Sequence, residues 1–320
     1  MDCITLTADD GAQIDVVVWQ PGAGPDGAGV QPRGIVQLVV GMHDYAARYD
    51  QFARVLAADG WLVIAGENRG GGPRALVSEE LGQMPDRGYH QLLDDMSMVI
   101  DHFRTGRLNL PWVLVGHSMG SFLARMMAAR RGRELAALVL IGTGWSLDPM
   151  TSLGIGVAEA QIALSGEDRR SRLMNTLIFG SFNAAFRPTR TDFDWLTRDR
   201  KMVDAYIADP LCNCVCSADF YRELLTLLRS ANSVDVMRAT PPQLPVGLFS
   251  GEADPVGAAG RGVRQVASRL RADGVRDVSV VLYPGARHEI LNEINRTRVH
   301  DEIRQWIDEK VPPAQLTQAS

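Results

Sequence analysis

The sequence lacks the long apolar run that a membrane-spanning helix needs. Such a helix requires about 18 consecutive apolar residues, and the 320-residue chain contains no run of that length. The first residues, Met1-Asp2-Cys3-Ile4, also lack the basic and apolar regions of a signal peptide. We therefore expect a cytoplasmic protein.

Basic residues are in the minority. The chain has 33 Lys and Arg against 38 Asp and Glu, which gives a formal net charge of −5 at pH 7. A nucleic-acid interface needs an excess of positive charge, so nucleic acid is not expected as a partner. The hydrophobic content of 46% and charged content of 22% are ordinary for a folded soluble protein.

Cysteine is scarce, with one residue at Cys3 and three in the segment Cys212, Cys214 and Cys216. The pattern Cys-x-Cys-x-Cys would offer a metal three neighbouring thiolates. Structural zinc usually takes four ligands in two separated pairs, and neither a second pair nor a histidine follows nearby in the sequence. We expect free thiols in a reducing compartment, and neither a metal nor a cofactor.

Apolar strands alternate with helices through most of the chain, beginning with a hairpin around the turn Asp9-Asp10-Gly11. Strands are predicted at residues 4–6, 13–19, 35–40, 61–65, 112–115, 135–141, 245–250 and 277–283. Helices are predicted at residues 48–59, 89–103, 122–131, 262–272 and 297–310. This order predicts an α/β fold with a mostly parallel eight-stranded sheet and an N-terminal antiparallel hairpin.

The alternation stops between Gly144 and Pro242. Helical segments at 172–179, 201–208 and 218–228 appear there without intervening buried strands. We expect a core of residues 1–143 and 243–312, a helical insertion of residues 144–242 and a polar tail of residues 313–320. The Gly- and Pro-rich stretch 21–32 is expected to be a surface loop.

One stretch, residues 113–121 with the sequence VLVGHSMGS, carries a catalytic signature. It places Gly-x-Ser-x-Gly between an apolar β-branched run and a helix-forming run, which is the pattern of a nucleophile elbow. The glycines are needed because side chains there would clash with the neighbouring backbone. Ser118 is therefore the expected nucleophile, and the helix start offers backbone N–H groups to a developing negative charge.

A serine hydroxyl needs a base, and His288 is the predicted one. It follows the last predicted strand and so lies at the carboxyl edge of the sheet, where the elbow also lies. His102 and His300, on predicted helices, are expected to be solvated. His117, inside the elbow, is expected to point away from the serine.

The imidazole in turn needs an acid that fixes its tautomer. Asp254 follows the strand at 245–250, at the same edge of the sheet, and is the predicted acid. Glu252 is a close competitor, whereas Asp273 and Asp277 precede a strand and are remote ones. The chain order serine, aspartate, histidine is the one expected of an α/β-hydrolase.

Acyl transfer also needs donors for the oxyanion. They are expected from the residue after the nucleophile, Met119, and from the loop after the first central parallel strand, at Met42. Both donors would be backbone N–H groups, so neither methionine side chain is a signal in itself.

These motifs together resemble those of the cap-bearing α/β-hydrolases of the monoacylglycerol lipase and lysophospholipase group, which is similar to serine aminopeptidase S33 (Hydrolase_4). The resemblance runs from about Gly34 to Lys310. It is carried by Gly41-Met42 with Arg48-Tyr49, by Asn68-Arg69-Gly70, by Gly116 to Gly120, by Gly251 to Asp254 and by Pro284 to Glu289. It implies a cofactor-free serine hydrolase that cleaves acyl esters of glycerol or lysolipids, with the insertion acting as a lid.

Two departures from the family pattern concern loops near the site. The chain has Val40-Gly41 where the family usually has His-Gly, which removes a side chain that braces the oxyanion loop but leaves the backbone donors. It has residues 67–72, ENRGGG, where the family has Asp-His-Arg-Gly-His-Gly, which is expected to alter how that loop is anchored.

The insertion carries enough apolar residues to line an acyl pocket and to touch a membrane surface transiently, although most are expected to pack the lid onto the core. They are Leu153, Ile155, Val157, Ile162, Leu173, Leu177, Ile178, Phe179, Phe182 and Phe186. An aminopeptidase or amidase on the same fold stays open as an alternative, with Glu159, Glu167 and Asp168 as candidate ammonium-binding carboxylates. So does a non-catalytic ligand-binding protein, whereas the serine in the elbow excludes an Asp-nucleophile dehalogenase or epoxide hydrolase.

Overall fold

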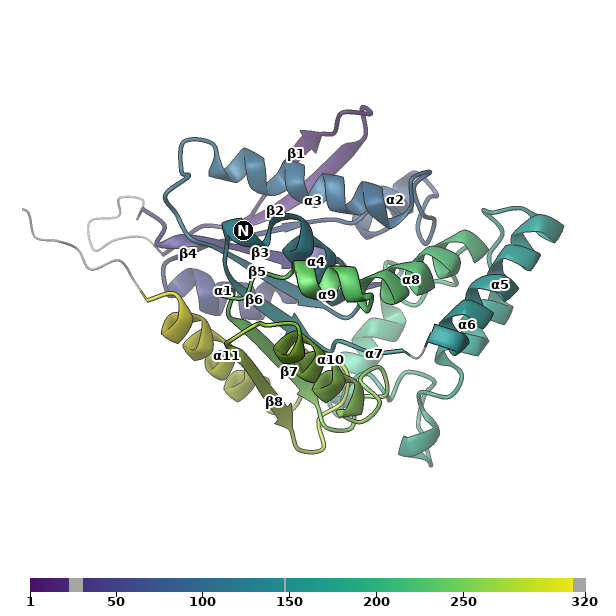
Figure 1. Ribbon diagram of the computed structural model, residues 1–320. Coiled ribbons are helices and arrows are strands. Elements are labelled where there is room, and N and C mark those ends of the chain that lie inside the picture. Colours follow the sequence, from purple (N-terminus) through teal and green to yellow (C-terminus); the bar gives the residue numbers. More distant parts are fainter. Residues whose placement is uncertain (23–30, 147, 313–320) are drawn as a thin grey trace, which may run out of the picture.

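A single twisted sheet of eight strands forms the centre of the computed structural model, which describes residues 1–22, 31–146 and 148–312 (Figure 1). The strands are β1 (Asp2–Thr7), β2 (Gln13–Trp19), β3 (Gly34–Val39), β4 (Trp61–Gly66), β5 (Trp112–His117), β6 (Leu135–Ile141), β7 (Val246–Gly251) and β8 (Val278–Tyr283). Their order is β1-β2-β4-β3-β5-β6-β7-β8. The pairs β1–β2 and β2–β4 are antiparallel and the others parallel, which confirms the predicted sheet and hairpin.

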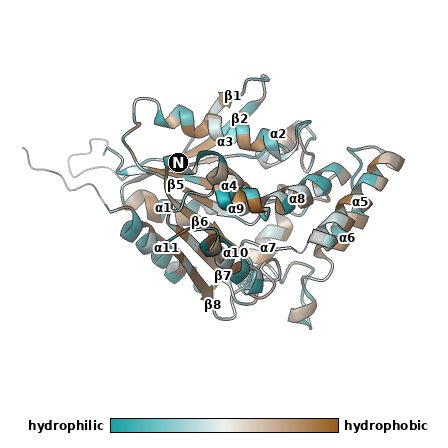
Figure 2. Cartoon of the chain, viewed as in Figure 1, coloured by the Kyte–Doolittle hydropathy of each residue, from teal (hydrophilic) through white to brown (hydrophobic). Residues whose placement is uncertain are grey.

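Continuous apolar runs form the central strands because both of their faces are covered. Every residue of β3, β5 and β7 is buried, and these strands read as unbroken runs rather than as alternating patterns. The edge strand β8 is only half-buried along most of its length. Figure 2 shows strands of the sheet in brown and much of the outer helical surface in teal.

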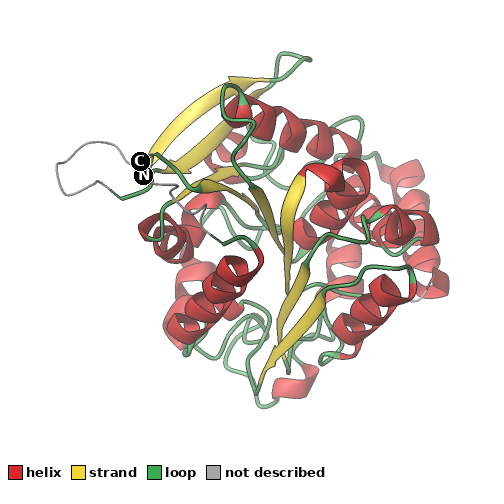
Figure 3. Ribbon diagram, turned by 60° about the vertical axis from the view of Figure 1, so that its left-hand side comes forward, coloured by secondary structure: helices red, strands yellow, loops and turns green. Residues whose placement is uncertain are grey.

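Helices cover both faces of the sheet (Figure 3). One face packs against α1 (Asp50–Ala58) and α11 (Arg296–Lys310), and the other against α3 (Tyr89–Arg104), α4 (Met119–Arg131) and α10 (Arg261–Ala272). The five predicted helices all form, with ends shifted by up to three residues. A short helix that was not predicted from the sequence, α2 (Gly72–Val77), follows the glycines of the loop after β4, and Pro73 lies in its first turn.

The insertion contains five helices and, among its described residues, no strand of the sheet. They are α5 (Asp148–Ser165), α6 (Arg172–Phe179), α7 (Arg200–Ala208), α8 (Ala218–Ala231) and α9 (Val234–Ala239). Serine caps start three of them, since Ser171, Ser217 and Ser233 accept hydrogen bonds from backbone amides of α6, α8 and α9. Figure 1 shows α5 and α6 at the end of the molecule farthest from α11.

One buried arginine ties both ends of the insertion to the core. Arg125, on α4, donates from Nη1 to the carbonyl of Gly144 at 3.4 Å and from Nη2 to Oδ1 of Asn232 at 2.6 Å. The helix that follows the elbow therefore also anchors the insertion. Most of the expected loop at 21–32 and the tail at 313–320 lie outside the described residues. None of the described helices is long and apolar enough to cross a membrane.

Candidate active site

A sharp turn between β5 and α4 presents Ser118. Its backbone has φ 55° and ψ −122°, a conformation that a residue with a side chain rarely adopts. A Cβ at Gly116 would lie 2.3 Å from the carbonyl oxygen of Gly120, and a Cβ at Gly120 would lie 2.2 Å from that of Val39. Both positions therefore require glycine, as the elbow pattern predicts.

The fold brings the serine, the histidine and the aspartate singled out in the sequence into one hydrogen-bonded row. His288 Nε2 lies 2.9 Å from Ser118 Oγ. His288 Nδ1 lies 3.0 Å from both carboxylate oxygens of Asp254. The two supporting side chains are buried, so their interaction is shielded from water.

A backbone amide fixes the carboxylate of Asp254. Its Oδ1 accepts a hydrogen bond from the amide of Val256 at 2.8 Å, which holds it facing the histidine. The competing Glu252 is exposed to solvent. Of the two remote candidates, Asp273 pairs with Arg269 and Asp277 with Lys310, so neither reaches the histidine.

The electrostatic surroundings favour a protonated His288. Burial alone would lower the pKa of the imidazole, but the adjacent charge and hydrogen bond of Asp254 outweigh it, and the pKa of His288 is raised above its ordinary value. The row of groups can therefore accept the serine proton and stabilise the resulting imidazolium.

The loop after β3 lies directly against the elbow. A Cβ at Gly41 would be 3.3 Å from Cβ of Ser118, so the next residue, Met42, is close to Ser118. Met119 is the first residue of α4, where amides have no acceptor within the helix. No described residue accepts a hydrogen bond from either amide, so both are free to bind an oxyanion.

The hydroxyl of Tyr49 holds this loop in place through hydrogen bonds. Its hydroxyl accepts a hydrogen bond from the amide of Gly41 at 3.3 Å and donates one to Oδ2 of Asp44 at 2.6 Å. Nδ1 of His117 lies 2.8 Å from the same hydroxyl. The loop thus has a side-chain brace although Val40 replaces the family's histidine. The Arg48-Tyr49 motif was part of the family resemblance, but nothing in the sequence indicated this role.

Charges beneath the loop are paired. Arg48 contacts Asp44 at 3.0 Å and Glu289 at 2.8 Å. Burial would raise the pKa of Asp44, but Arg48 and the neighbouring hydrogen bonds bring it down to about 2. Asp44 therefore stays ionised in its buried position.

A cavity of about 660 Å³ opens onto Ser118 and His288. The insertion supplies much of its wall, and its apolar lining includes Phe122, Trp145, Ile178, Phe179, Phe182, Leu224, Leu225, Leu228 and Val256. The sequence offered ten apolar residues of the insertion for an acyl pocket. Three of them line the cavity: Ile178, Phe179 and Phe182. Leu153, Leu173 and Leu177 instead face solvent.

The insertion also touches the histidine loop directly. The amide of Glu289 donates to the carbonyl of Leu196 at 2.7 Å, and the ring centroid of Trp195 lies 5.2 Å from that of His288. Movement of residues 195–196 would therefore change the surroundings of His288.

The other histidines divide into surface and buried residues. His102 is exposed as expected. The expectation for His300 was wrong: it is buried against Phe52, and its Nε2 lies 3.0 Å from the carbonyl of Leu291. His43, to which the sequence gave no role, lies beside two cysteines of the insertion.

Comparisons with known proteins agree with this geometry. A family model described as Serine aminopeptidase, S33 (Hydrolase_4) matches residues 30–295. A monoacylglycerol lipase of Mycolicibacterium smegmatis is 29% identical over 307 residues, which cover 93% of each chain. The monoglyceride lipase of Homo sapiens is 24% identical over 318 residues, 97% of this chain and 91% of that one. The crystal structure of a highly thermostable carboxyl esterase from Bacillus coagulans, in complex with glycerol, matches with a TM-score of 0.88 and 25% identity, covering 97% of this chain and 98% of that one.

Proposed function

Because the chain belongs to the serine aminopeptidase S33 (Hydrolase_4) family of α/β-hydrolases and is a carboxylic ester hydrolase, we propose that it cleaves monoacylglycerol or lysophospholipid-type esters through an acyl-enzyme. One observation carries the proposal: the hydrogen-bonded row Ser118, His288 and Asp254 opens into a cavity whose wall combines aromatic and aliphatic side chains with polar ones.

In the first half of the reaction, Oγ of Ser118 attacks the acyl carbon while its proton passes to Nε2 of His288. Asp254 keeps the proton on Nδ1 and stabilises the imidazolium. The amides of Met42 and Met119 bind the oxyanion. Collapse of the tetrahedral intermediate breaks the bond to the alcohol, which leaves with the proton from His288.

In the second half, water takes the place of the alcohol. His288 accepts a proton from the water as the water oxygen attacks the acyl carbon. When the bond between the acyl carbon and Ser118 breaks, His288 returns this proton to Oγ of Ser118 and the carboxylic acid leaves. The reaction needs no cofactor.

The substrate class is inferred from the cavity and from the relatives. Apolar side chains of the insertion, including Phe179, Phe182 and Leu225, would hold an acyl chain, and residues 144–242 would act as a lid. The mycobacterial and human relatives are named for the hydrolysis of monoacylglycerols.

An aminopeptidase is the weaker reading of the same fold. It would need free carboxylates to hold the substrate's ammonium group, and Glu159, Glu167 and Asp168 are exposed and outside the cavity lining. Asp44 and Glu289 do border the cavity, but both are paired with Arg48, and Asp192, the third carboxylate in the lining, is exposed to solvent. The two buried carboxylates are thus already neutralised, which favours an uncharged ester over a peptide with a free amino terminus.

The test compares wild type with Ser118→Ala on a medium-chain p-nitrophenyl ester and on a panel of monoacylglycerols and lysophospholipids. We expect the variant to lose hydrolysis and labelling by a fluorophosphonate probe. Ser268→Ala, an exposed serine on α10 outside the cavity lining, is the control and keeps both. Retention of most activity in Ser118→Ala would overturn the mechanism, and absence of wild-type labelling would favour a non-catalytic binder.

A further inference from the structure

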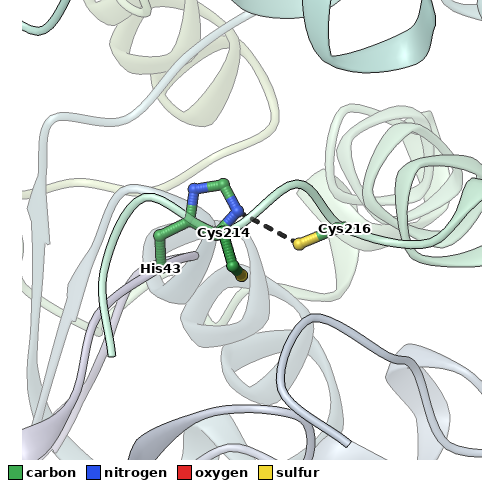
Figure 4. A group of neighbouring side chains, drawn as sticks. All are labelled: His43, Cys214 and Cys216. Carbon is green, nitrogen blue, oxygen red and sulfur yellow. Dashed lines mark hydrogen bonds between the residues drawn. The ribbon is translucent and has the colours of Figure 1, made fainter. Parts of the chain in front are cut away.

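His43, Cys214 and Cys216 meet where the loop after β3 touches the insertion (Figure 4). His43 Nε2 lies 3.1 Å from Sγ of Cys216, although 173 positions separate the two residues. No histidine lies near the cysteine triplet in the sequence, but the fold brings His43 next to it. We propose that these three side chains bind a thiophilic metal ion, with Zn²⁺ as the best fit, and so link the insertion to the oxyanion loop.

The donor atoms lie close to the separations that such an ion needs. The three ligand atoms all lie within 4.8 Å of one another. Tetrahedral zinc, with bonds of about 2.0–2.3 Å to nitrogen and sulfur, would place its ligands roughly 3.6–3.8 Å apart. Binding would therefore adjust these side chains by about 1 Å. Two thiolates and one imidazole are also the donor types that select zinc over magnesium or calcium.

The fold holds Cys216 in place, and a glycine lies against both sulfur ligands. Cys216 is fully buried, its amide donates to the hydroxyl of Tyr221 and its carbonyl accepts from the amide of Ser171. A Cβ at Gly82 would lie 3.0 Å from the sulfur atoms of both Cys214 and Cys216. Any other residue at position 82 would crowd the site, and its φ of 75° also favours glycine.

An ion can reach this position from the main cavity. His43 and Cys214 both belong to the lining that also contains Ser118, so the fourth coordination position would face solvent or substrate. Two thiolates and a neutral imidazole would balance the charge of Zn²⁺. The site would then be neutral beside the guanidinium of Arg170, whose Nη1 donates to the carbonyl of Val215 at 3.0 Å.

Binding would act on the catalytic machinery through neighbouring residues. His43 directly follows Met42, and the cysteines belong to the segment that leads into α8. A bound ion would therefore join the oxyanion loop to the insertion. We expect slower hydrogen exchange in residues 41–44 and 212–217 when Zn²⁺ is present.

The decisive experiment is a Co²⁺ titration of the reduced, chelator-treated full chain, after a thiol assay has counted its four free cysteines. We expect one Co²⁺ per chain, with a thiolate-to-metal charge-transfer band that Zn²⁺ abolishes by displacement. Cys214→Ser and His43→Gln should each weaken binding by about 100-fold or more, since each removes a ligand. Cys212→Ser, in the same segment but outside the cluster, should bind like wild type.

Two results would overturn the proposal. One is a fully reduced wild-type protein that shows no thiolate-to-metal band. The other is equal affinity in wild type, Cys214→Ser and His43→Gln. Because Cys214 is only half-buried, its substitution keeps the test valid even if a variant of buried Cys216 fails to fold. Neither readout depends on ester hydrolysis, so this proposal and the proposed function fail separately.

Discussion

Arg48 Nη2 lies 2.8 Å from Glu289 Oε2, which joins the two loops on which the proposed mechanism depends. Glu289 directly follows the base, and Arg48 also contacts Asp44, two residues after Met42. The side chains of all three are nearly buried. We therefore expect Arg48 and its two carboxylates to fix the spacing between the proposed base, His288, and the proposed oxyanion donor Met42.

Removing this arginine should damage catalysis more than substrate binding. In Arg48→Met the two carboxylates lose their partner, and a broken buried pair costs about 3–5 kcal/mol of stability. We expect kcat to fall by about 10- to 100-fold with KM little changed, because oxyanion stabilisation depends on geometry. Steady-state kinetics on a soluble ester, below the variant's unfolding temperature, measures both.

Arg33→Met is the matched control for this change. Arg33 also pairs with two carboxylates, those of Asp59 and Asp308, and is mostly buried. It lies at the opposite edge of the sheet, because Arg33 directly precedes β3 whereas the candidate site follows the carboxyl ends of the parallel strands. Its loss should lower the unfolding temperature but leave kcat unchanged. An equal fall in kcat in both variants would mean that Arg48 acts only through stability.

The sequence was sufficient for the sheet and for the three groups in the hydrogen-bonded row. Parallel strands end at one edge, so residues that follow β5, β7 and β8 had to meet there. It was also sufficient for preferring Asp254 to Glu252 as the carboxylate partner of His288. The loop after β7 has turned towards the histidine loop by the time it reaches position 254.

The remaining features depend on contacts between distant segments. Tyr49 as a brace and His43 beside Cys216 become visible only when the loop after β3 is placed against the elbow and the insertion. His300 was misjudged because helix periodicity gives a face but not what covers it, and here Phe52 of α1 does. Conversely, Leu153, Leu173 and Leu177 were candidates for a pocket by sequence, but no described residue covers them and they face solvent.

The pH dependence of hydrolysis should report the proposed base. His288 must be neutral to accept the serine proton, and its pKa is raised by Asp254. The acidic limb of kcat/KM should therefore have its midpoint above the ordinary histidine value of about 6.5. Asp254→Asn should shift this midpoint downward and lower kcat by about 10⁴-fold. Glu252→Gln, in the same loop but exposed, should change neither; a wild-type midpoint in Asp254→Asn would contradict the assignment.

Stability should depend on pH through Glu67. Burial raises the pKa of this carboxyl to about 8, although the amide of Ala46 bonds to it. Between the unfolded pKa of about 4.3 and pH 8, the folded state holds a proton that the unfolded state has lost. The free energy of unfolding must then fall as pH rises through this window.

Glu67→Gln removes the titrating proton and keeps one acceptor for Ala46. We expect little difference from wild type at pH 4. At pH 8.5 the variant should be more stable by on the order of 5 kcal/mol and should unfold at a higher temperature. Thermal unfolding by circular dichroism at both pH values measures it. Glu79→Gln, an exposed carboxyl, is the control and should show no such pH-dependent gain. A constant difference at both pH values would rule out the titration of Glu67.

Contact with a lipid surface is predicted for the outer face of the insertion. Leu153 and Leu164 of α5 are 71% and 88% exposed, and Leu173 and Leu177 of α6 are more than half exposed. Residues 153 and 164 are three helical turns apart and lie on one side of α5. Exposed leucines gathered on two neighbouring helices are typical of a surface that binds an apolar partner.

The test is co-sedimentation with phosphatidylcholine vesicles. Leu153→Ser/Leu164→Ser should weaken binding by about 10-fold or more, since each leucine would return apolar area to water. Hydrolysis of a soluble ester should stay unchanged, because neither residue lines the cavity. Leu108→Ser is the control. The side chain of Leu108 is 72% exposed but lies outside the insertion, so this variant should bind vesicles like wild type. If both variants lose binding equally, the contact is not specific to the insertion.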